Sequence, residues 1–279
     1  MHKLGIIGYP LTHSISAVIQ KAGFESLSLE GSYDVLETTP EELIPRIKYL
    51  KTNNYEGFNV TIPLKVPMSL FLDDIDEYAN IAGCVNTVKI LEDKSFIGYN
   101  TDIYGFKKAI PDYIDLNKQR VSIIGTGGVA RAAVVGLAEK GVTNIDFYTR
   151  NIINSRQTLD YVRHKFPTIE FNVYQVQNMR SLESSKMIVN ATPIGMKGFM
   201  ADQMPISRSN LDNLNTDTII YDIVYNPIKT ILIKEAEQRG LKTIGGLDML
   251  IYQAQRAIEI WVNKTPDFNI MKIAALQVL

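Results

Sequence analysis

The sequence contains few of the side chains that bind metal ions or cross-link a chain. It has one cysteine, Cys84, which excludes an internal disulfide and a cysteine-rich metal site. Its three histidines do not pair with one another at helical ligand spacing, so a zinc site of histidine and cysteine is not expected. We therefore predict a protein without a bound metal.

Long apolar runs and an excess of one charge are also missing. No run of about 18 apolar residues occurs, so no transmembrane helix is predicted. Lys and Arg number 29 and Asp and Glu 30, and a net charge of −1 provides no general attraction for nucleic acid or an anionic membrane. The first residues, MHKLGIIGYP, lack the apolar stretch and cleavage site of a signal peptide. These features predict a cytoplasmic protein.

Apolar runs of strand length alternate with amphipathic stretches of helix length along most of the chain. This alternation predicts an α/β fold with a parallel sheet and crossover helices. At roughly 150 residues per domain, a chain of 279 residues has room for two domains. The polar, proline-containing segment Pro111–Arg120 is a candidate connector. The predicted strands and helices fall on either side of it.

The expected elements before the connector are three strands, a hairpin and four helices. The strands are Leu4–Gly8, Tyr33–Glu37 and Gly57–Ile62, and Cys84–Ile90 and Ser95–Tyr99 form the hairpin. The helices are Ser16–Leu27, with Ser14 or Ser16 as its cap, a helix opened by Thr39-Pro40, Leu70–Ile81 and Ile103–Ile110.

After the connector, the same alternation continues to the last residue. Strands are predicted at Arg120–Ile124, Asn144–Tyr148, Phe171–Tyr174, Met187–Asn190, Ile219–Asp222 and Thr243–Ile244. Helices are predicted at Arg131–Lys140, Asn154–Lys165, Thr230–Arg239, Asp248–Asn263 and Ile270–Leu279.

A glycine-rich turn between the strand Arg120–Ile124 and the helix that follows is typical of a dinucleotide-binding unit. Gly125 permits the sharp turn, and Gly127 removes a side chain where the backbone must approach a pyrophosphate. The segment runs Gly125, Thr126, Gly127, Gly128, Val129 and Ala130, and amides at the helix N-terminus would face the phosphates. The alternative is a tight turn that binds no ligand.

The residues after the next strand favour NADP over NAD. An NAD site places a carboxylate there to bind the ribose 2′-hydroxyl, whereas a 2′-phosphate requires arginine. Here Asn144–Tyr148 is followed by Thr149-Arg150-Asn151, and Arg156 lies further on. Arginine presents a planar, permanently charged fork that suits phosphate. A solvated surface arginine is the alternative interpretation.

Uncharged polar residues gather at the predicted strand ends of the first hundred residues. They include Ser14 and Ser16, Asn59 and Thr61, and Asn86. Ligands of open α/β sheets bind beyond the carboxyl ends of the strands, so these groups are expected to converge on a small, hydroxyl-rich ligand. Taken singly, each also has a structural explanation: Ser14 as a helix cap, Asn86 as a turn residue, Thr61 as a strand residue.

Lys65 and Asp102 are the candidates for acid–base chemistry. Hydride reduction of a ketone leaves an alkoxide that must be protonated as it forms, and a side chain within hydrogen-bond reach does this best. A paired Lys65 and Asp102 would donate and accept protons, and Asp102 would also orient a hydroxyl. The alternative is a structural salt bridge between two loops.

Together these motifs resemble the shikimate dehydrogenase family over essentially the whole chain. The matching segments, in the family's order, are Gly8-Tyr9-Pro10, His13-Ser14-Ile15-Ser16, Asn59-Val60-Thr61-Ile62-Pro63-Leu64-Lys65, Ala82-Gly83-Cys84-Val85-Asn86-Thr87, Gly98-Tyr99-Asn100-Thr101-Asp102, Gly125–Ala130, Asn190-Ala191-Thr192-Pro193-Ile194-Gly195-Met196, Asp222-Ile223-Val224-Tyr225-Asn226-Pro227, and Gly245-Gly246-Leu247-Asp248-Met249-Leu250 with Gln253.

The resemblance implies the reversible, NADPH-dependent reduction of 3-dehydroshikimate to shikimate, a step toward the aromatic amino acids. It implies that Lys65 is the catalytic acid/base, with Asp102 beside it. The implied substrate contacts are Ser14, Ser16 and Tyr225 for the carboxylate, and Asn59, Thr61, Asn86, Asp102 and Gln253 for the ring hydroxyls. The implied cofactor contacts are Glu77, Gly125, Thr126, Gly127, Gly128, Val129, Ala130, Thr149, Arg150, Arg156, Ile223 and Gly246.

Two positions depart from the family pattern, and both bear on the 2′-phosphate. Thr149 stands where many relatives have asparagine, and Arg156 is offset from the usual second arginine. Which of Arg150 and Arg156 dominates phosphate binding therefore stays open.

We predict two α/β domains with a cleft between them. Residues 1–103, completed by the C-terminal helices in 247–279, would bind a small-molecule substrate. Residues 104–246 would form a doubly wound, Rossmann-type NADP-binding domain. The protein would be a monomer or a homodimer without nucleic-acid or membrane partners. The alternatives are a quinate/shikimate dehydrogenase with relaxed substrate or NAD use, and a non-catalytic nucleotide-sensing relative.

Overall fold

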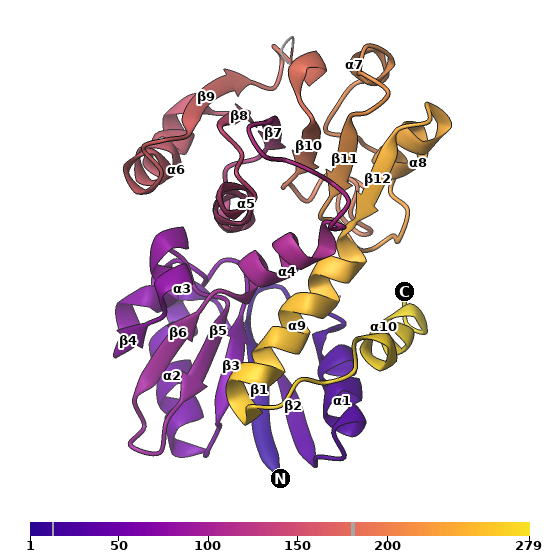
Figure 1. Ribbon diagram of the computed structural model, residues 1–279. Helices are drawn as coiled ribbons and strands as arrows, with labels where there is room; N and C mark the ends of the chain where they lie inside the picture. Colours follow the sequence, from indigo (N-terminus) through magenta and orange to yellow (C-terminus); the bar gives the residue numbers. More distant parts are fainter. Residues whose placement is uncertain (13, 180–181) are drawn as a thin grey trace. The chain divides into compact units, whose positions relative to one another are not determined.

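The computed structural model describes residues 1–12, 14–179 and 182–279. His13, part of one matching segment, lies outside the described residues. The chain forms two compact units (Figure 1). Unit 1 comprises Met1–Gly105 and Ile251–Val278, and unit 2 comprises Phe106–Leu250 and the terminal Leu279. Each unit is built around its own sheet.

The sheet of unit 1 is mixed and has the strand order β2-β1-β3-β5-β6-β4. Its strands are β1 (His2–Gly8), β2 (Gly31–Glu37), β3 (Gly57–Val60), β4 (Asp74–Ile75), β5 (Thr87–Ile90) and β6 (Phe96–Tyr99). The first three are parallel, and β5 and β6 form the antiparallel hairpin that the sequence predicted. The antiparallel pairing of β5 with β3 brings the start of β5 to the end of β3.

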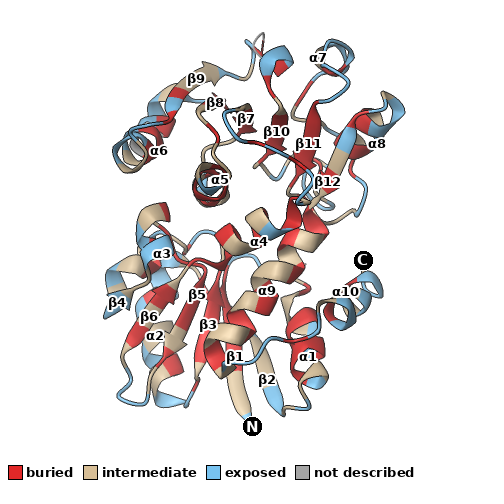
Figure 2. Ribbon diagram, viewed as in Figure 1, coloured by how far each residue is buried: buried red, intermediate tan, exposed pale blue. Residues whose placement is uncertain are grey.

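The helical elements of unit 1 are mostly those predicted from the sequence. They are α1 (Ser16–Ser26), η1 (Pro40–Glu42), α2 (Leu43–Thr52), η2 (Pro67–Phe71), α3 (Glu77–Ala82), α4 (Thr101–Ala109), α9 (Gly246–Val262) and α10 (Phe268–Leu276). The chain passes from one unit to the other within α4 and again within α9. The buried core of the unit includes Phe58, Phe96, Leu64 and Met68, none of them exposed. Strand β3 is buried along its whole length (Figure 2).

The predicted helix over Leu70–Ile81 is wrong. The segment contains the end of η2, the short strand β4 and most of α3. Asp73 exchanges hydrogen bonds with Phe96, since its amide donates to the Phe96 carbonyl and its carboxylate accepts from the Phe96 amide at 2.7 Å. Asp76 then caps α3, accepting from the Ala79 amide at 3.1 Å. These aspartates satisfy backbone groups outside a continuous helix, which is why the helix breaks.

The sheet of unit 2 is entirely parallel, with the order β12-β11-β10-β7-β8-β9. Its strands are β7 (Arg120–Ile124), β8 (Asn144–Thr149), β9 (Glu170–Gln175), β10 (Met187–Asn190), β11 (Ile219–Asp222) and β12 (Lys242–Gly245). Numbered within the unit and read from the other edge, this is the order 3-2-1-4-5-6 of a doubly wound dinucleotide-binding fold. The order reverses between β7 and β10.

Helices accompany the strands of unit 2 along the chain. They are α5 (Gly128–Glu139), α6 (Ile152–Lys165), η3 (Leu182–Ser184), α7 (Arg208–Asp212) and α8 (Ile231–Gln238). Helix α5 begins at Gly128, three positions before the predicted Arg131, so part of the glycine-rich turn already belongs to the helix. The short α7 was not predicted. Within the described residues, no helix has the length and apolar character needed to cross a membrane.

Candidate active site

The polar residues predicted in unit 1 lie at one end of its sheet. Strands β1 and β3 run parallel, so the loops that follow them leave at the same end. Because β5 pairs antiparallel with both neighbours, Thr87 lies opposite Asn59 on one side and Tyr99 on the other. Asn86, Thr101 and Asp102 therefore reach the end of the sheet where the loop after β3 leaves.

Lys65 and Asp102 form a close ion pair although 37 residues separate them in sequence. The Lys65 ammonium donates to Asp102 Oδ2 at 2.5 Å, and the two side chains are 14% and 9% exposed. Lys65 lies in the turn after β3, and its carbonyl accepts from the Val85 amide at 3.0 Å. Asp102 is in the first turn of α4, where the helix dipole favours a carboxylate.

Asn86 holds Asp102 from the other side. Its Nδ2 donates to Asp102 Oδ1 at 2.8 Å and to Thr101 Oγ1 at 3.0 Å, and its Oδ1 accepts from the Thr101 amide at 2.7 Å. Both carboxylate oxygens of Asp102 are therefore fixed, one by Asn86 and one by Lys65. Such charge-assisted bonds in a shielded place hold a carboxylate in one orientation.

The serines of the loop after β1 do not cap α1. The N-cap position is Ile15 and no side chain caps the helix, although the Ser16 amide donates to Ser14 Oγ at 3.3 Å. The loops after β1 and β3 are tied together because the Tyr9 amide donates to the Ile62 carbonyl at 2.9 Å. Ser14, Ser16 and Thr61 are all half-buried.

Gln253 joins this group from α9, and Tyr225 does not. Thr101 Oγ1 donates to Gln253 Oε1 at 3.4 Å, which links α9 to the start of α4. Tyr225 belongs to unit 2, where it follows β11, and burial raises the pKa of its hydroxyl. Ser14, Ser16, Asn59, Thr61, Lys65, Asn86, Asp102 and Gln253 are the predicted substrate-site residues that share unit 1.

In unit 2, the glycine-rich turn follows β7, next to the point where the strand order reverses. Gly125 has φ +104°, and a Cβ there would lie 2.9 Å from the Ala191 carbonyl oxygen, so glycine is required for the turn itself. Gly127 is different because nothing lies within 4 Å of a Cβ added to it. It is the N-cap of α5 and no side chain caps that helix.

These observations fit the pyrophosphate of a dinucleotide. The space beside Gly127 is open, and the helix N-terminus presents backbone amides there. The carbonyl of Thr126 accepts from Thr158 Oγ1 at 3.1 Å, which fastens the turn to α6. Ala130, the last small residue of the motif, is fully buried where α5 packs.

The segment after β8 places cationic groups on the surface of the same unit. Arg150 directly follows the strand and Arg156 lies on α6, both exposed, and no ion pair joins either one to a described residue. Thr149 Oγ1 accepts from the Asn151 amide at 3.3 Å, which shapes the turn that presents Arg150. Two guanidinium groups that form no ion pair with the described residues, and no carboxylate at this position, fit a 2′-phosphate.

Three more predicted cofactor residues occupy different places. Gly246 begins α9, and a Cβ there would come within 2.1 Å of the Ile223 carbonyl oxygen, so Gly246 permits close packing against Ile223. Glu77 is exposed and begins α3 in unit 1. It is thus separated by unit from the other predicted cofactor residues.

The sequence did not single out a buried carboxylate at the end of β11. Asp222 accepts from Asn190 Nδ2 at 2.9 Å, from Thr230 Oγ1 at 2.6 Å and from the Val224 amide at 3.1 Å. Burial raises its pKa to about 6, against an ordinary value of 3.8. Asn190 also accepts from Thr192 Oγ1 at 2.6 Å. Asp222 therefore ties together the loops after β10 and β11.

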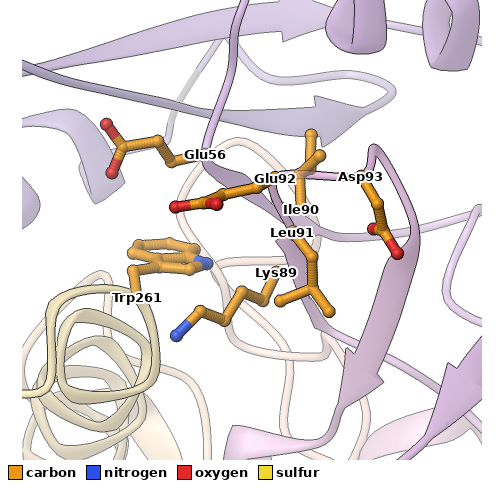
Figure 3. A pocket seen from close by; sticks show the side chains of 7 residues that line it. All are labelled: Glu56, Lys89, Ile90, Leu91, Glu92, Asp93 and Trp261. Carbon is orange, nitrogen blue, oxygen red and sulfur yellow. The ribbon is translucent and has the colours of Figure 1, made fainter.

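A separate pocket lies at the opposite end of the unit 1 sheet (Figure 3). Its volume is about 800 Å³, and Glu56, Lys89, Ile90, Leu91, Glu92, Asp93 and Trp261 line it. Two of its polar groups bind backbone carbonyls of the same unit: Lys89 Nζ donates to the Ile260 carbonyl at 2.7 Å, and Trp261 Nε1 to the Val88 carbonyl at 2.9 Å. None of the predicted site residues lies in it.

Comparisons with known proteins show which sequences and structures the chain is similar to. A family profile described as "Shikimate dehydrogenase substrate binding domain" matches residues 6–88, and one described as "Shikimate 5'-dehydrogenase C-terminal domain" matches residues 246–276. The chain is similar to shikimate dehydrogenase (NADP(+)) of Archaeoglobus fulgidus, with 36% identity over 276 residues that cover 99% of this chain and 98% of the relative.

Solved structures show the same fold with ligands. A shikimate dehydrogenase in complex with NADP+ matches with a TM-score of 0.90 and 34% identity, covering 99% of this chain and 95% of the other. The Thermus thermophilus enzyme, in complex with NADP(H) and shikimate, matches with a TM-score of 0.86 and 30% identity over 100% of both chains. A quinate dehydrogenase from Corynebacterium glutamicum in complex with NAD matches with a TM-score of 0.90 and 25% identity, covering 99% of both chains.

Proposed function

The chain belongs to the shikimate dehydrogenase family, and we propose that Lys65 and Asp102 form the acid–base pair of its reaction. It is an NADP-dependent oxidoreductase acting on a CH–OH group, and it reduces 3-dehydroshikimate reversibly to shikimate in the shikimate pathway. The observation that carries the proposal is the contact of 2.5 Å between the Lys65 ammonium and Asp102.

The chemistry at Lys65 follows from what ketone reduction requires. NADPH, when bound, supplies the hydride. Lys65 donates a proton from Nζ to the oxygen of the former carbonyl, so that no free alkoxide is released. In the direction of oxidation, Lys65 takes the hydroxyl proton. Asp102 keeps the ammonium pointed at one place and accepts a hydrogen bond from a neighbouring substrate hydroxyl.

The remaining polar groups of unit 1 are proposed to hold the substrate. We assign the hydroxyls of Ser14 and Ser16 to the carboxylate, with Tyr225 assisting from unit 2. Thr61, Asn86, Asp102 and Gln253 are assigned to the ring hydroxyls. Ser16 and Thr61 are half-buried, and their hydroxyls make no hydrogen bond with another described side chain, which leaves them available for a ligand.

Unit 2 is proposed to hold the cofactor. The turn Gly125–Ala130 would bind the pyrophosphate, and Thr149, Arg150 and Arg156 the 2′-phosphate end. Ile223 and Gly246 would lie near the nicotinamide, and Glu77 would contribute from unit 1. The open space beside Gly127 and the uncapped start of α5 support this assignment.

One assay tests the function and its rivals. The absorbance of reduced nicotinamide is followed with purified protein, using shikimate or quinate with NADP or NAD in four combinations. We expect shikimate with NADP to give the highest kcat/KM. Comparable kcat/KM for quinate or NAD would indicate the relaxed relative, to which the likeness to a quinate dehydrogenase points. Nucleotide binding without turnover of either substrate would indicate a sensing protein.

We propose a cytoplasmic enzyme, because its single cysteine, Cys84, is a buried free thiol of the kind that a reducing compartment preserves. A monomer or a homodimer is proposed, and sedimentation of the purified protein distinguishes the two.

A further inference from the structure

Tyr33, on the edge strand β2, makes a hydrogen bond that the reaction as described so far does not use. Its hydroxyl donates to Asn59 Oδ1 at 2.6 Å. Burial raises the pKa of Tyr33 well above 10, so the hydroxyl keeps its hydrogen and acts as a donor. Gln20 Nε2, on α1, donates to the same oxygen at 3.4 Å, and Gln20 is fully buried.

These two donors leave Asn59 only one orientation. Its Oδ1 accepts from Tyr33 and Gln20, and its Nδ2 must therefore point the other way, where it donates to Thr87 Oγ1 at 2.9 Å and to the Asn86 carbonyl at 3.2 Å. A carboxamide has two hydrogens to donate and two lone pairs to accept with. All four are used, so Asn59 has none left for a substrate hydroxyl.

The bonds continue in one direction toward the ion pair. Thr87 Oγ1, which accepts from Asn59, donates to Asn86 Oδ1 at 3.1 Å. Asn86 Nδ2 donates to Asp102 Oδ1 at 2.8 Å, and Asp102 Oδ2 accepts from Lys65. Each hydroxyl has only one hydrogen to donate. Exchanging the oxygen and nitrogen positions of either asparagine carboxamide would therefore break the hydrogen bonds on both sides of it.

We propose that Tyr33 and Asn59 are positioning residues, which act through Thr87 and Asn86 to set the orientation of Asp102 beside Lys65. This inference rests on the proposed function of the ion pair. Under this proposal Asn59 does not contact a ring hydroxyl of the substrate, unlike what the family resemblance implies. By the same count Asn86 is fully bonded within the network, since its Nδ2 donates to Asp102 and Thr101 and its Oδ1 accepts from the Thr101 amide and Thr87. Its proposed contact with a ring hydroxyl therefore requires one of these bonds to be exchanged.

A second tyrosine provides a matched control for the experiment. Tyr55, just before β3, donates to Asp34 Oδ2 at 2.5 Å, and Asp34 is the neighbour of Tyr33 on β2. Tyr55 is 3% exposed. Tyr55→Phe thus removes a shielded tyrosine hydroxyl from the same part of the sheet, but its partner Asp34 is not part of the series of bonds that leads to the ion pair.

The test compares kcat and KM for shikimate in the wild type, Tyr33→Phe and Tyr55→Phe, with the melting temperature of each. The net worth of one hydrogen bond predicts that Tyr33→Phe lowers kcat about three- to tenfold. We expect kcat to fall by a larger factor than KM rises, because the proton transfer from Lys65 is made only in the transition state, whereas the contact of Asp102 with a ring hydroxyl is made in both states. Tyr55→Phe should lower the melting temperature and leave kcat unchanged.

A double-mutant cycle tests the route. Thr87 is fully buried, and Thr87→Val keeps its shape while removing the bonds from Asn59 to Thr87 and from Thr87 to Asn86. The direct bond from Asn59 Nδ2 to the Asn86 carbonyl remains. If Tyr33 acts through Thr87, Tyr33→Phe lowers kcat no further in the Thr87→Val background. If the double variant instead loses kcat by the product of the two separate factors, Tyr33 does not act through Thr87.

Other outcomes would overturn the role itself. A rise in KM without loss of kcat in Tyr33→Phe would mean that this end of the network binds substrate. An unchanged kcat in a folded Tyr33→Phe would mean that the hydroxyl serves stability alone, as in Tyr55→Phe. Inactivity of the wild type with shikimate and NADP would refute the proposed function instead, so the two failures are distinguishable.

Discussion

The exposed guanidinium of Arg150 gives the most selective prediction at the scale of single residues. Its proposed contact with the 2′-phosphate has no counterpart in NAD. Arg150→Ala should therefore weaken NADP binding and leave NAD binding nearly unchanged. A charge-assisted hydrogen bond at an exposed site predicts a loss of roughly tenfold to a hundredfold for NADP. Titration of both cofactors against wild type and variant measures it.

The loss of NADP affinity in Arg150→Ala depends on whether Arg156 also binds the 2′-phosphate. If it reaches the same phosphate from α6, Arg156→Ala alone will have a small effect, and the double variant will lose more NADP affinity than Arg150→Ala. Equal losses for NAD and NADP would mean that Arg150 contacts a shared part of the cofactor or supports the fold. The assignment of the 2′-phosphate to this turn would then be wrong.

Residue types at strand ends could be predicted from the sequence, but their partners could not. Lys65 and Asp102 were singled out by the family resemblance together with the chemistry of ketone reduction, and the sheet brings them together across 37 residues. Tyr33 was missed because a lone tyrosine in a strand resembles any strand residue. Its partner Asn59 is set by the register of β1 with β2 and β3, which a single sequence does not reveal.

At the scale of elements, a substitution in the glycine-rich turn can separate the role of a glycine in cofactor binding from its role in the fold. Gly127→Ala adds a methyl group in open space at an extended φ of −77°, so the fold should tolerate it. The cost to stability should be about 1 kcal/mol, as for alanine at an N-cap. NADP affinity should fall at least tenfold, on the order of one lost charge-assisted contact, because the methyl group occupies the space assigned to the pyrophosphate.

Gly246→Ala is the contrasting variant. Its Cβ would come within 2.1 Å of the Ile223 carbonyl oxygen, so α9 must shift and the melting temperature should drop. Melting curves and NADP titrations of both variants test the distinction. Normal NADP affinity in a folded Gly127→Ala would show that no pyrophosphate binds there.

The buried carboxylate at the end of β11 predicts a dependence of stability on pH. The pKa of Asp222 is about 6 in the folded protein against an ordinary value of 3.8, so the folded state holds the proton more tightly than the unfolded state. The free energy of unfolding should then fall as pH rises from about 4 to about 6, by about 3 kcal/mol in all, and change little above that.

Urea unfolding of wild type and Asp222→Asn across this range tests the sign. The difference in unfolding free energy, wild type minus variant, should decrease as pH rises. Asp217 provides a control of opposite sign, since Lys186 lowers the pKa of that exposed carboxylate. A difference that is constant with pH for Asp222→Asn would contradict the burial argument.

Most strands of unit 2 could be predicted within one or two residues, because a buried parallel strand is a short apolar run bounded by turn residues. The least accurate prediction of secondary structure was the helix over Leu70–Ile81 in unit 1, where apolar residues recur as they would on a helix. The decisive groups there are Asp73 and Asp76, whose side chains bond backbone amides. Such local competition cannot be recognised from hydrophobic periodicity.

At the scale of the whole molecule, each unit should respond to its own ligand. Hydrogen exchange with shikimate alone should slow in residues 59–65 and 86–102 of unit 1. NADP alone should slow it in residues 125–130 of unit 2. At a ligand concentration of about 100 times Kd, binding is worth roughly 2.7 kcal/mol, enough for clear protection.

Two residues are assigned to a ligand whose other proposed contacts lie in the other unit. Tyr225 lies in unit 2 but is assigned to the substrate, and Glu77 lies in unit 1 but is assigned to the cofactor. Shikimate should therefore also protect the loop that carries Tyr225. Protection of unit 2 alone by shikimate would contradict the substrate assignment to unit 1.

Steady-state kinetics of Lys65→Ala with shikimate and NADP test the proposed acid–base role of Lys65 most directly. Lys89→Ala is the matched control, since its ammonium is held by the Ile260 carbonyl at the other end of the same sheet. We expect Lys65→Ala to lower kcat by a factor on the order of 100 to 10,000, the usual contribution of a positioned acid/base, with a smaller change in KM. Near-normal kcat with a raised KM would show that Lys65 only binds substrate, and would contradict the mechanism.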